Sequence, residues 1–241
     1  MNQLTRIDEF RQVLADYHVS DEARSILAKT KLVLLVGPSS SGRNTIINEL
    51  LTTGDYHYIV SDTTRKPRIN NGVPEQNGRE YWFRTEDELL ADLQAGMFLE
   101  AAIIHNQQVS GISIRELSAA AAEGKIAINE IEVVGGENIH AVKPDALFLF
   151  IVPPSFDEWM TRMKARGELP EDETRRRLES AVQELQVALA HDYYRFVVND
   201  TFKHTARDIH AMSQGLDVPD DDEARAIAEQ LLHDTQQFLG R

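Results

Sequence analysis

The feature that most constrains the fold is a glycine-rich segment that joins a short apolar run to an amphipathic one. The apolar run covers residues 32–36, the glycine-rich segment 37–45 and the amphipathic run 46–51. The spacing Gly37-x-x-x-x-Gly42 lets successive backbone N–H groups surround a phosphate at the start of a helix, where the helix dipole favours negative charge. This order predicts a buried strand, a phosphate-binding loop and a helix. Taken alone, the same pattern also fits a glycine-rich turn with a purely structural role.

Two residues of this loop depart from the usual pattern. A phosphate-binding loop normally continues with a lysine, which contacts the β- and γ-phosphates, and then a serine or threonine, whose hydroxyl binds Mg²⁺. This chain has Arg43 and Asn44 at those places, and the hydroxyl of Thr45 comes one position late. A planar guanidinium fork is not equivalent to an ammonium group, and an amide oxygen is only a neutral ligand for Mg²⁺. The loop therefore predicts phosphate binding and leaves phosphate transfer open.

A second group of polar residues follows the loop. Arg65 and Arg68 flank Pro67, and the proline keeps the residue before it out of a helix. Two guanidinium forks three residues apart suit bidentate capture of a phosphate, and the hydroxyl of Tyr81 offers a further donor. The alternative is a charged surface loop with solvated arginines, which this segment alone does not exclude.

Several segments, in this order, resemble the guanylate kinase family. They are G-P-S-S-S-G at 37–42, S-D-T-T-R-K-P-R at 61–68, N-G-R-E-Y-W-F at 77–83, F-L-E-A at 98–101, N-E-I-E-V at 129–133 and F-V-V-N-D at 196–200. The resemblance runs from Lys31 to Asp200, and the arginine-rich segment is its most specific part. It implies a P-loop nucleoside-monophosphate-kinase fold. In that α/β fold a parallel sheet lies between two layers of helices, with a β-rich GMP-binding insert and a helical lid.

The resemblance also implies an acceptor site for GMP. Arg65, Arg68 and Tyr81 match the family's contacts to the GMP phosphate, and Ser61 lies in the segment close to the guanine. Glu100 matches the carboxylate that receives the guanine N1–H and the exocyclic amino group. Adenine lacks this pair of adjacent donors, so one carboxylate can select guanine. The alternative is an acidic residue on a strand edge.

Two places in the implied acceptor site depart from the family pattern. Glu132 stands where the family usually has an aspartate, and it is implied to contact guanine or a water on Mg²⁺. In the segment 109–112, Ser110 replaces a phosphate-contacting tyrosine and Ile112 replaces a base-contacting hydroxyl. These changes leave open a kinase that acts on a different monophosphate.

The donor site and the lid are implied in the same way. Arg162 and Arg166 are four residues apart and share one face of a predicted helix that starts near Ser155, and Arg177 lies on the next helix. The family's arginines at these three places close over the transferred phosphoryl group and, with Arg43, would form the catalytic set. A solvent-facing helical hairpin is the alternative. The implied ATP-binding residues are Gly37, Ser39, Ser40, Ser41, Gly42, Arg43, Asn44, Thr45 and Asn199.

Apolar runs separated by helical stretches predict the organisation of the chain. The runs are short and rich in β-branched or aromatic residues, the pattern of an α/β protein with a parallel sheet. They lie at 32–36, 126–131, 146–152 and 195–198. We predict an N-terminal helical extension at 1–30, in which Ser20 caps a helix, a guanylate-kinase-like domain at 31–200 with the insert at 61–112 and the lid at 155–185, and a C-terminal helical region at 201–241.

Composition limits the classes of partner. The 241 residues are 42% hydrophobic, carry a net charge of −14 and include no cysteine. The acidic balance argues against a nucleic-acid groove or an anionic membrane surface, and no apolar run approaches the roughly 18 residues that span a membrane. The N-terminus lacks the pattern of a secretory signal, so we expect a cytoplasmic protein whose partners are nucleotides.

Two functions follow as hypotheses. The first is a guanylate-kinase-like enzyme that uses ATP and Mg²⁺ to convert GMP into GDP by direct in-line transfer. The second is a non-catalytic module that binds a nucleotide or a phosphorylated peptide, and it draws its support from Arg43 and Asn44. The lid arginines and Glu100 favour the enzyme, because a peptide-binding module has no evident need for them.

Overall fold

The computed structural model describes residues 4–70, 72–165, 167, 170–216 and 221–240. The chain divides into two compact units, and each is described by itself. The first consists of Met1–Lys31, His57–Ala127 and Ala141–Pro144, and the second of Leu32–Tyr56, Ile128–His140 and Asp145–Arg241. The N-terminal extension and the insert therefore belong to the same unit, although more than twenty residues separate them in the sequence.

A mainly parallel sheet has most of its residues in the second unit, while His57, Tyr58, Ile126 and Ala127 at its margins belong to the first. The five-stranded sheet has the order β11-β10-β1-β9-β2, and the register pairs Val33 of β1 with Leu147 of β10 in parallel. These strands form because their residues are almost all buried and many are β-branched or aromatic, which suits a sheet covered on both faces. The strands are β1 (Leu32–Val36), β2 (Tyr56–Tyr58), β9 (Ile126–Glu130), β10 (Leu147–Val152) and β11 (Tyr194–Val198).

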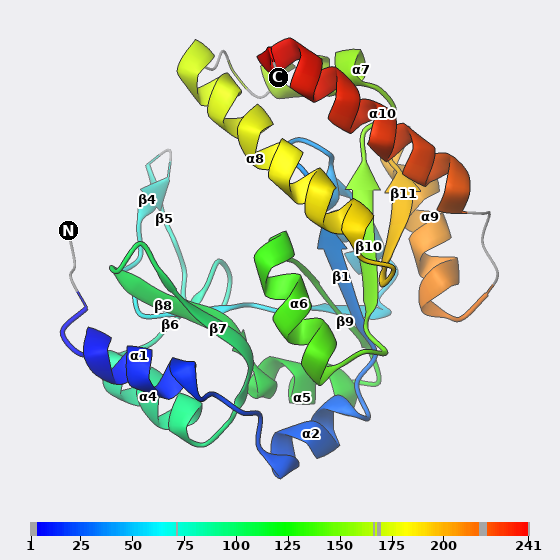
Figure 1. Cartoon of the computed structure of the whole chain (residues 1–241). Coiled ribbons are helices and arrows are strands. Elements are labelled where there is room, and N and C mark those ends of the chain that lie inside the picture. The colour runs from blue at the N-terminus through cyan, green and yellow to red at the C-terminus, as the bar shows by residue number, and fades with distance from the viewer. Residues whose placement is uncertain (1–3, 71, 166, 168–169, 217–220, 241) are drawn as a thin grey trace. The chain divides into compact units, whose positions relative to one another are not determined.

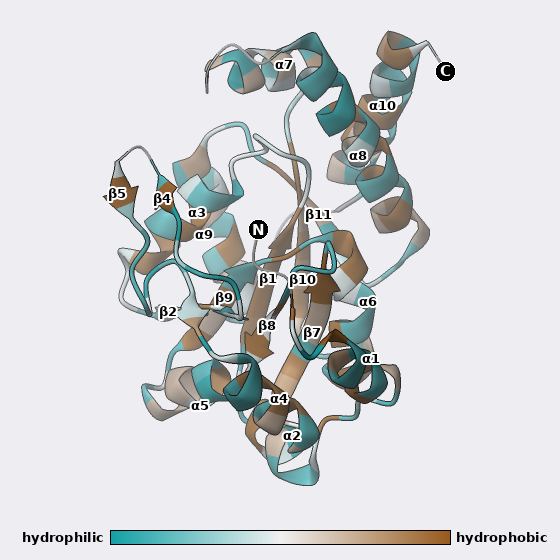
Figure 2. Cartoon of the chain, turned by 90° about the vertical axis from the view of Figure 1, so that its left-hand side faces the viewer, coloured by the Kyte–Doolittle hydropathy of each residue, from teal (hydrophilic) through white to brown (hydrophobic). Residues whose placement is uncertain are grey.

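Helices cover both faces of this sheet. Figure 2 shows α3 and α9 on one side of strands β1, β10 and β11, and α8 and α10 on the other. Figure 1 shows α10 running beside α8. At the start of α7, the hydroxyl of Ser155 caps the helix by accepting from the Glu158 N–H. The helices of this unit are α3 (Arg43–Leu51), α6 (Val133–Val142), α7 (Phe156–Ala165), α8 (Glu171–Ala190), α9 (Phe202–Ser213) and α10 (Asp221–Leu239).

The first unit contains a second sheet, of four strands in the order β6-β3-β8-β7. Its long hairpin joins β7 to β8 in antiparallel register, with Ala101 opposite Gly111. A two-stranded ribbon, β4 with β5, lies beside the arginine-rich segment in sequence. The strands are β3 (Asp62–Thr63), β4 (Ile69–Asn70), β5 (Val73–Pro74), β6 (Trp82–Phe83), β7 (Phe98–Ile104) and β8 (Gln108–Ser113), and the helices are α1 (Ile7–Ala15), α2 (Asp21–Leu27), α4 (Glu86–Gln94) and α5 (Ile114–Ala122).

The predicted three-layer α/β core is confirmed, and most element boundaries agree with the sequence patterns. Ser20 caps α2 by accepting from the Ala23 N–H at 3.2 Å, as its position predicts. The insert holds the helix α4 as well as strands, and the second helix of the predicted lid runs on to Ala190. Within the described part of the chain, no helix combines the length and the apolar character that crossing a membrane requires.

Candidate active site

The loop between β1 and α3 has a backbone that only glycine permits at its two ends. Gly37 has φ 138° and Gly42 has φ 100°, both in the left-handed region. A Cβ on Gly37 would lie 2.5 Å from the carbonyl oxygen of Ile151, and one on Gly42 would lie 2.2 Å from Nδ2 of Asn199. The glycines are therefore required by close packing as well as by backbone conformation. This matches the loop predicted from the sequence.

Two buried side chains hold the loop in shape. The indole Nε1 of Trp159 donates to the carbonyl oxygen of Ser39 at 2.8 Å, and Nδ2 of Asn199 donates to that of Ser41 at 2.7 Å. The Asn199 Oδ1 in turn accepts from the hydroxyl of Thr205 at 3.2 Å. Because Trp159 and Asn199 are buried, these bonds fix the loop in advance of any ligand. Asn199, predicted as an ATP contact, is thus bonded within the protein through both of its amide atoms.

The loop presents two unpartnered hydroxyl groups. Ser40 and Ser41 are buried, and their Oγ atoms have no hydrogen-bond partner among the described residues. A buried hydroxyl without a partner costs about 1–3 kcal/mol, so such groups usually meet a ligand or water. Phosphate oxygens accept hydrogen bonds from hydroxyls, and the glycine backbone leaves room for them. The loop therefore fits a phosphate chain.

The two altered loop residues both turn to one carboxylate at the end of β9. Nε of Arg43 lies 3.6 Å from Glu130 Oε2, and Nη1 donates to the carbonyl oxygen of Ile131 at 3.3 Å. With the Asn44 amide oriented so that its nitrogen faces the carboxylate, Nδ2 donates to both Glu130 oxygens at 2.8 and 3.0 Å. Arg43 thus forms an ion pair with the carboxylate of Glu130, and Asn44 donates hydrogen bonds to it.

Two carboxylates at the end of β9, Glu130 and Glu132, bear on the binding of Mg²⁺. Glu132 follows β9 and is exposed, while burial raises the pKa of Glu184 on α8, with Glu132 adding to the rise and Arg43 opposing it. Carboxylates with bound waters are the ligands that Mg²⁺ prefers, and Glu130 and Glu132 fit that preference. Position 44 offers an amide in place of a hydroxyl. The described residues contain no group of three or more acidic, histidine or cysteine side chains arranged to hold a metal ion.

A cavity of about 400 Å³ lies at the rim of the loop. Arg162 enters it from α7, with Nη1 donating to the carbonyl oxygen of Asn199 at 2.8 Å and Nη2 to that of Asp200 at 3.2 Å. Its Nε also donates to Glu158 at 2.9 Å. The structure therefore brings Arg162 to the rim of the loop, and its contact with a transferred group stays a prediction. The lining includes Ser40, Gly42, Thr45, Arg162, Asn199 and Asp200.

The structure describes only one of the other two predicted lid arginines. Arg177 lies on α8 and donates through Nε to Glu173, one turn earlier, at 2.9 Å. It is about one-third exposed, so its guanidinium can be reached by a ligand. Arg166 lies outside the described residues. The contact of these arginines with a transferred group stays a prediction.

In the first unit, Arg65 is already held in a fixed orientation. Its Nη1 and Nη2 donate to the two oxygens of Glu75 at 2.5 and 2.9 Å, and its guanidinium lies over the rings of Tyr81, at 4.6 Å, and Phe83, at 5.5 Å. The Arg68 N–H donates to Glu75 as well, at 2.8 Å. These bonds, led by the one from Arg65, lower the pKa of Glu75 to about 2. The structure thus brings Arg65 and Tyr81 together, as the sequence predicts.

The other predicted phosphate contacts lie close by. The side chain of Arg68 is exposed and makes no ion pair with any described residue, so its guanidinium can take an anion. The carbonyl oxygen of Ser61 accepts from the Trp82 N–H at 2.9 Å, which ties this segment to β6. Ser110, at the place of the family's tyrosine, shares a hydrogen bond with the hydroxyl of Thr63 at 2.8 Å. That serine stabilises the sheet.

Glu100 lies on β7, opposite β8. A register shift falls between Phe98 and Glu100, so one residue of β7 is left out of the pairing with β8. A Cβ on Gly111 would lie 2.4 Å from the carbonyl oxygen of Glu100, which explains the glycine at that place. Ile112 is buried and paired with Glu100 across the strands, so it packs in the core.

The sequence patterns missed the residues that hold the predicted ones. Glu75, Trp159, Glu130 and Glu184 each contact or influence a loop or arginine named above. Glu130 stands beside Glu132 in the strand-end segment and could have been found by that position. The other three have no local pattern, because their partners lie on other elements.

Comparisons with known proteins give a consistent picture. A family model described as guanylate kinase matches residues 29–215. The guanylate kinase of Corynebacterium diphtheriae is 35% identical over 187 residues, which cover 77% of this chain and 95% of that protein. That of Trichormus variabilis is 37% identical over 174 residues, covering 72% and 84%. The crystal structure of guanylate kinase from Anaplasma phagocytophilum superposes with a TM-score of 0.54 at 26% identity and covers 77% of this chain and 85% of that one.

Proposed function

The chain belongs to the guanylate kinase family, and on that premise we propose that it transfers the γ-phosphoryl group of ATP to GMP. The observation that carries the proposal is the arrangement of Arg65. Glu75 accepts from Nη1 and Nη2, and the guanidinium lies over the ring of Tyr81, so its orientation is held and the Nε–H edge remains to donate to an anion. Bidentate guanidinium groups suit phosphate, and a fixed fork loses little freedom when it binds.

The acceptor nucleotide binds the first unit in this proposal. Arg65, Arg68 and the Tyr81 hydroxyl contact the GMP phosphate. Glu100 accepts the guanine N1–H and the exocyclic amino group, and Ser61 contributes to the same base.

The donor nucleotide binds the second unit. The backbone N–H groups of the loop and the hydroxyls of Ser40 and Ser41 donate to the ATP phosphates, which satisfies the two orphaned hydroxyls. Arg43 supplies positive charge beside them. Mg²⁺, when bound with the nucleotide, neutralises charge on the phosphates, and Glu130 and Glu132 are the carboxylates that would hold its waters.

Catalysis of phosphoryl transfer depends mainly on the positioning of the reactants and on positive charge around the transferred group. Arg162 already lies at the rim of the loop, where it would contact the donor phosphates. Arg177 is placed to approach from α8, and Arg166 is proposed to join it. Each properly placed charge contributes on the order of a hundredfold to the rate.

A second function has one observation in its favour. Arg43 and Asn44, the two altered loop residues, are both bonded to Glu130, and the usual loop lysine and hydroxyl are missing. A protein with this loop would bind GMP or a phosphorylated peptide at Arg65 without turning over ATP. This binding module is the candidate that any test must separate from the kinase.

The test combines turnover with binding on one preparation. ADP release is measured with ATP, Mg²⁺ and each of GMP, dGMP, AMP, CMP and UMP, and GMP binding is measured by calorimetry. We expect ADP release with GMP and dGMP and none with the pyrimidine nucleotides. GMP binding without ADP release would replace the kinase by the binding module. Turnover that prefers AMP, CMP or UMP would show that a different monophosphate is the acceptor.

A further inference from the structure

The segment that follows α1 encloses the turn that leads into β7. This segment, residues 17–20, precedes the stretch that the family model matches, which begins at residue 29. It contacts Gly96, Met97 and Phe98, which come directly before Leu99 and the proposed guanine-selecting Glu100. A part of the chain outside the region matched by the family model therefore contacts the start of the strand that carries Glu100.

The central contact is the hydroxyl of Tyr17. It donates to the carbonyl oxygen of Phe98 at 2.7 Å and accepts from the N–H of the same residue at 2.7 Å. One hydroxyl thus satisfies both backbone groups of one strand residue. Burial raises the pKa of Tyr17 to about 12. The hydroxyl carries its proton at neutral pH, as it would at the ordinary value of 10, and can make both bonds.

Further contacts hold the turn before Phe98. The Ser20 N–H donates to the carbonyl oxygen of Gly96 at 3.0 Å, and the Ser20 hydroxyl lies 3.7 Å from the sulfur of Met97. Gly96 has φ 69°, and a Cβ there would lie 2.7 Å from the Ser20 nitrogen and 2.8 Å from the carbonyl oxygen of His18. The two backbones approach so closely that only glycine fits between them.

The Tyr17 bonds fall at an irregular point of the sheet. Phe98 pairs with Ser113 and Glu100 pairs with Ile112, so the register shifts by one residue between them. Such bulges redirect the side chains that follow, and they need outside support because the ladder is interrupted there. Tyr17 supplies that support on the residue where the shift begins. Tyr17 is therefore bonded two residues before Glu100, where the register shift begins.

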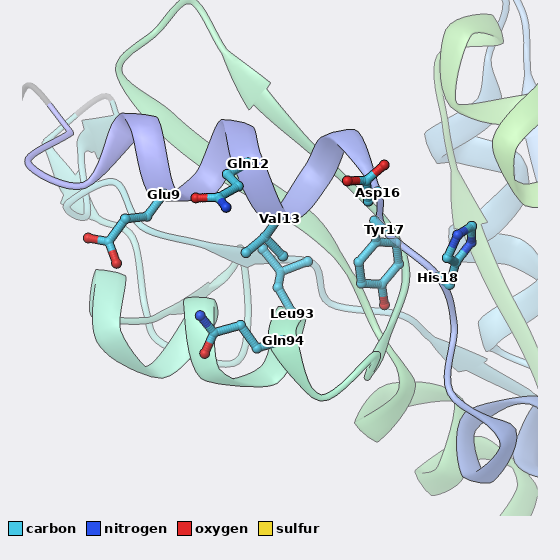
Figure 3. A pocket seen from close by; sticks show the side chains of 8 residues that line it. All are labelled: Glu9, Gln12, Val13, Asp16, Tyr17, His18, Leu93 and Gln94. Atoms are coloured by element: carbon cyan, nitrogen blue, oxygen red, sulfur yellow. The ribbon is translucent and has the colours of Figure 1, made fainter.

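The N-terminal extension is firmly anchored, so the support is rigid. Leu4 and Phe10 pack with Leu89, Leu93 and Phe98 in one buried cluster. The carboxylate of Glu86 at the start of α4 accepts from the backbone N–H groups of residues 5 and 6, at 2.8 to 3.1 Å. Figure 3 shows Val13 of α1 and Leu93 of α4 facing each other between the two helices, with Tyr17 just beyond the end of α1.

We propose that Tyr17 is a positioning residue for Glu100, and that the N-terminal extension thereby sets the preference of the acceptor site for guanine. This inference rests on the proposed function, because it takes Glu100 as the group that reads the base. With the hydroxyl in place, Glu100 meets both the N1–H and the exocyclic amino group. Without it, the bulge relaxes and the second of these bonds weakens first.

The test compares GMP with inosine monophosphate, which keeps the N1–H but lacks the exocyclic amino group. Dissociation constants for both are measured by calorimetry on the full chain, as the wild type and as Tyr17→Phe. The wild type is expected to prefer GMP about tenfold, the usual worth of one charge-assisted hydrogen bond. In Tyr17→Phe the GMP affinity falls about tenfold, and the ratio of the two dissociation constants falls at least about threefold.

Tyr56→Phe is the matched control. Tyr56 lies in the second unit, and its hydroxyl also has two partners, His210 at 3.1 Å and Ser213 at 2.9 Å. Its loss costs similar stability but leaves Glu100 untouched, so the nucleotide ratio stays at the wild-type value. Thermal unfolding of both variants confirms that each is folded.

Three outcomes would overturn the inference, and they differ in whether the proposed function still stands. An unchanged ratio in Tyr17→Phe, with a selective wild type, removes the role of Tyr17 and leaves the proposed function standing. An equal fall of the ratio in both variants shows a general loss of structure. A wild type that does not bind GMP, or does not prefer it, removes the acceptor-site assignment together with the inference.

Discussion

Each of the two units holds an arginine that is assigned to a phosphate, and each arginine is paired with a carboxylate, but the pairs differ. Arg65 is 10% exposed and Glu75 7%, and the pair makes two direct bonds at 2.5 and 2.9 Å. Arg43 is 21% exposed and Glu130 30%, and their nearest charged atoms are 3.6 Å apart. The acceptor arginine is locked, whereas the donor arginine is loosely held.

The difference follows the sequence. In the acceptor region the arginine-rich segment keeps the family pattern, and Arg65 is oriented by Glu75 and the ring of Tyr81 before any ligand binds. In the donor region Arg43 and Asn44 replace the usual residues and share Glu130. A preorganised group loses less freedom on binding, so we expect acceptor binding to be strong and the donor loop to limit the rate.

Of the changes predicted here, removal of Arg65 is expected to lower the activity with GMP the most. Arg65→Ala deletes the oriented guanidinium and leaves the nearly buried carboxylate of Glu75 without its main partner. Because a bidentate charge-assisted contact is lost, kcat/KM for GMP should fall at least about a hundredfold. ADP release at saturating ATP, with GMP varied, measures it.

Arg79→Ala is the control for that variant. Arg79 lies in the same region but is 52% exposed, and among the described residues it is paired only with its neighbour Glu80. It should leave kcat/KM within about twofold of the wild type, since exposed pairs contribute little. Equal losses in both variants would mean that the arginines act through the general charge of the region.

Restoration of the usual loop residues is expected to have the next largest effect. Arg43→Lys combined with Asn44→Ser supplies an ammonium group and a hydroxyl, and it removes the bonds to Glu130. The maximal rate should rise about tenfold or more, while KM for GMP stays unchanged because the acceptor region is untouched. Steady-state ADP release measures both quantities. A rate that stays flat or falls would show that the loop has its own arrangement of phosphate contacts.

Elements that depend on local pattern were predictable from the sequence. The β1–loop–α3 order, the cap at Ser20 and the parallel strands were all found, because glycine spacing, a capping serine and buried apolar runs act over a few residues. These patterns fix the backbone and bring the phosphate loop to the end of a strand. They also gave the acceptor pair of Arg65 and Tyr81, through the family resemblance.

Contacts between distant segments were not predictable in this way. Trp159 donates to Ser39 across 120 residues, and Tyr17 reaches Phe98 across 81. Glu75 is only ten residues from Arg65, yet their pairing depends on the ribbon of β4 and β5 that folds the chain back. Each pairing depends on tertiary packing, which no spacing in the sequence encodes.

A smaller loss of activity is expected from Glu75→Gln, which tests whether the ion pair with Glu75 helps Arg65 to bind GMP. The amide keeps the shape but loses the charge, so KM for GMP should rise several-fold with an unchanged maximal rate. The pKa of Glu75 in the folded chain is about 2, below its usual value of 4.5. The stabilisation by its charge is therefore fully present above about pH 4.5 and is lost as the pH falls towards 2.

Urea unfolding at several pH values measures the stabilisation that the charge of Glu75 provides. The wild type should be more stable than Glu75→Gln at pH 7, and the difference should shrink below pH 4.5. Glu229→Gln, at an exposed place on α10, serves as the control. A difference that does not depend on pH would mean that shape, and not charge, holds Arg65.

The smallest effect is expected from Glu184→Gln on the donor side. Burial raises the pKa of Glu184 above its usual 4.5, Glu132 adds to this rise, and Ser180 and Arg43 oppose it. Because the folded-state pKa is the higher one, the protonated carboxyl stabilises the fold below pH 4.5, and that contribution is lost as the pH rises through the folded-state pKa. At pH 7 the charged carboxylate is a cost, and glutamine removes it.

We therefore expect Glu184→Gln to raise the melting temperature by about 2–4 °C at pH 7, the shift that about 1 kcal/mol causes in a chain of this size. The hydroxyl of Ser180 can still donate, at its present 3.0 Å, to the amide oxygen that replaces the carboxylate. Glu229→Gln, at an exposed place on α10, should change nothing. If the gain disappears at pH 4, it comes from the cost of burying the charged carboxylate of Glu184, to which Glu132 adds and which Ser180 and Arg43 oppose. If the gain persists at pH 4, where the carboxyl is protonated, it does not come from the charge of Glu184.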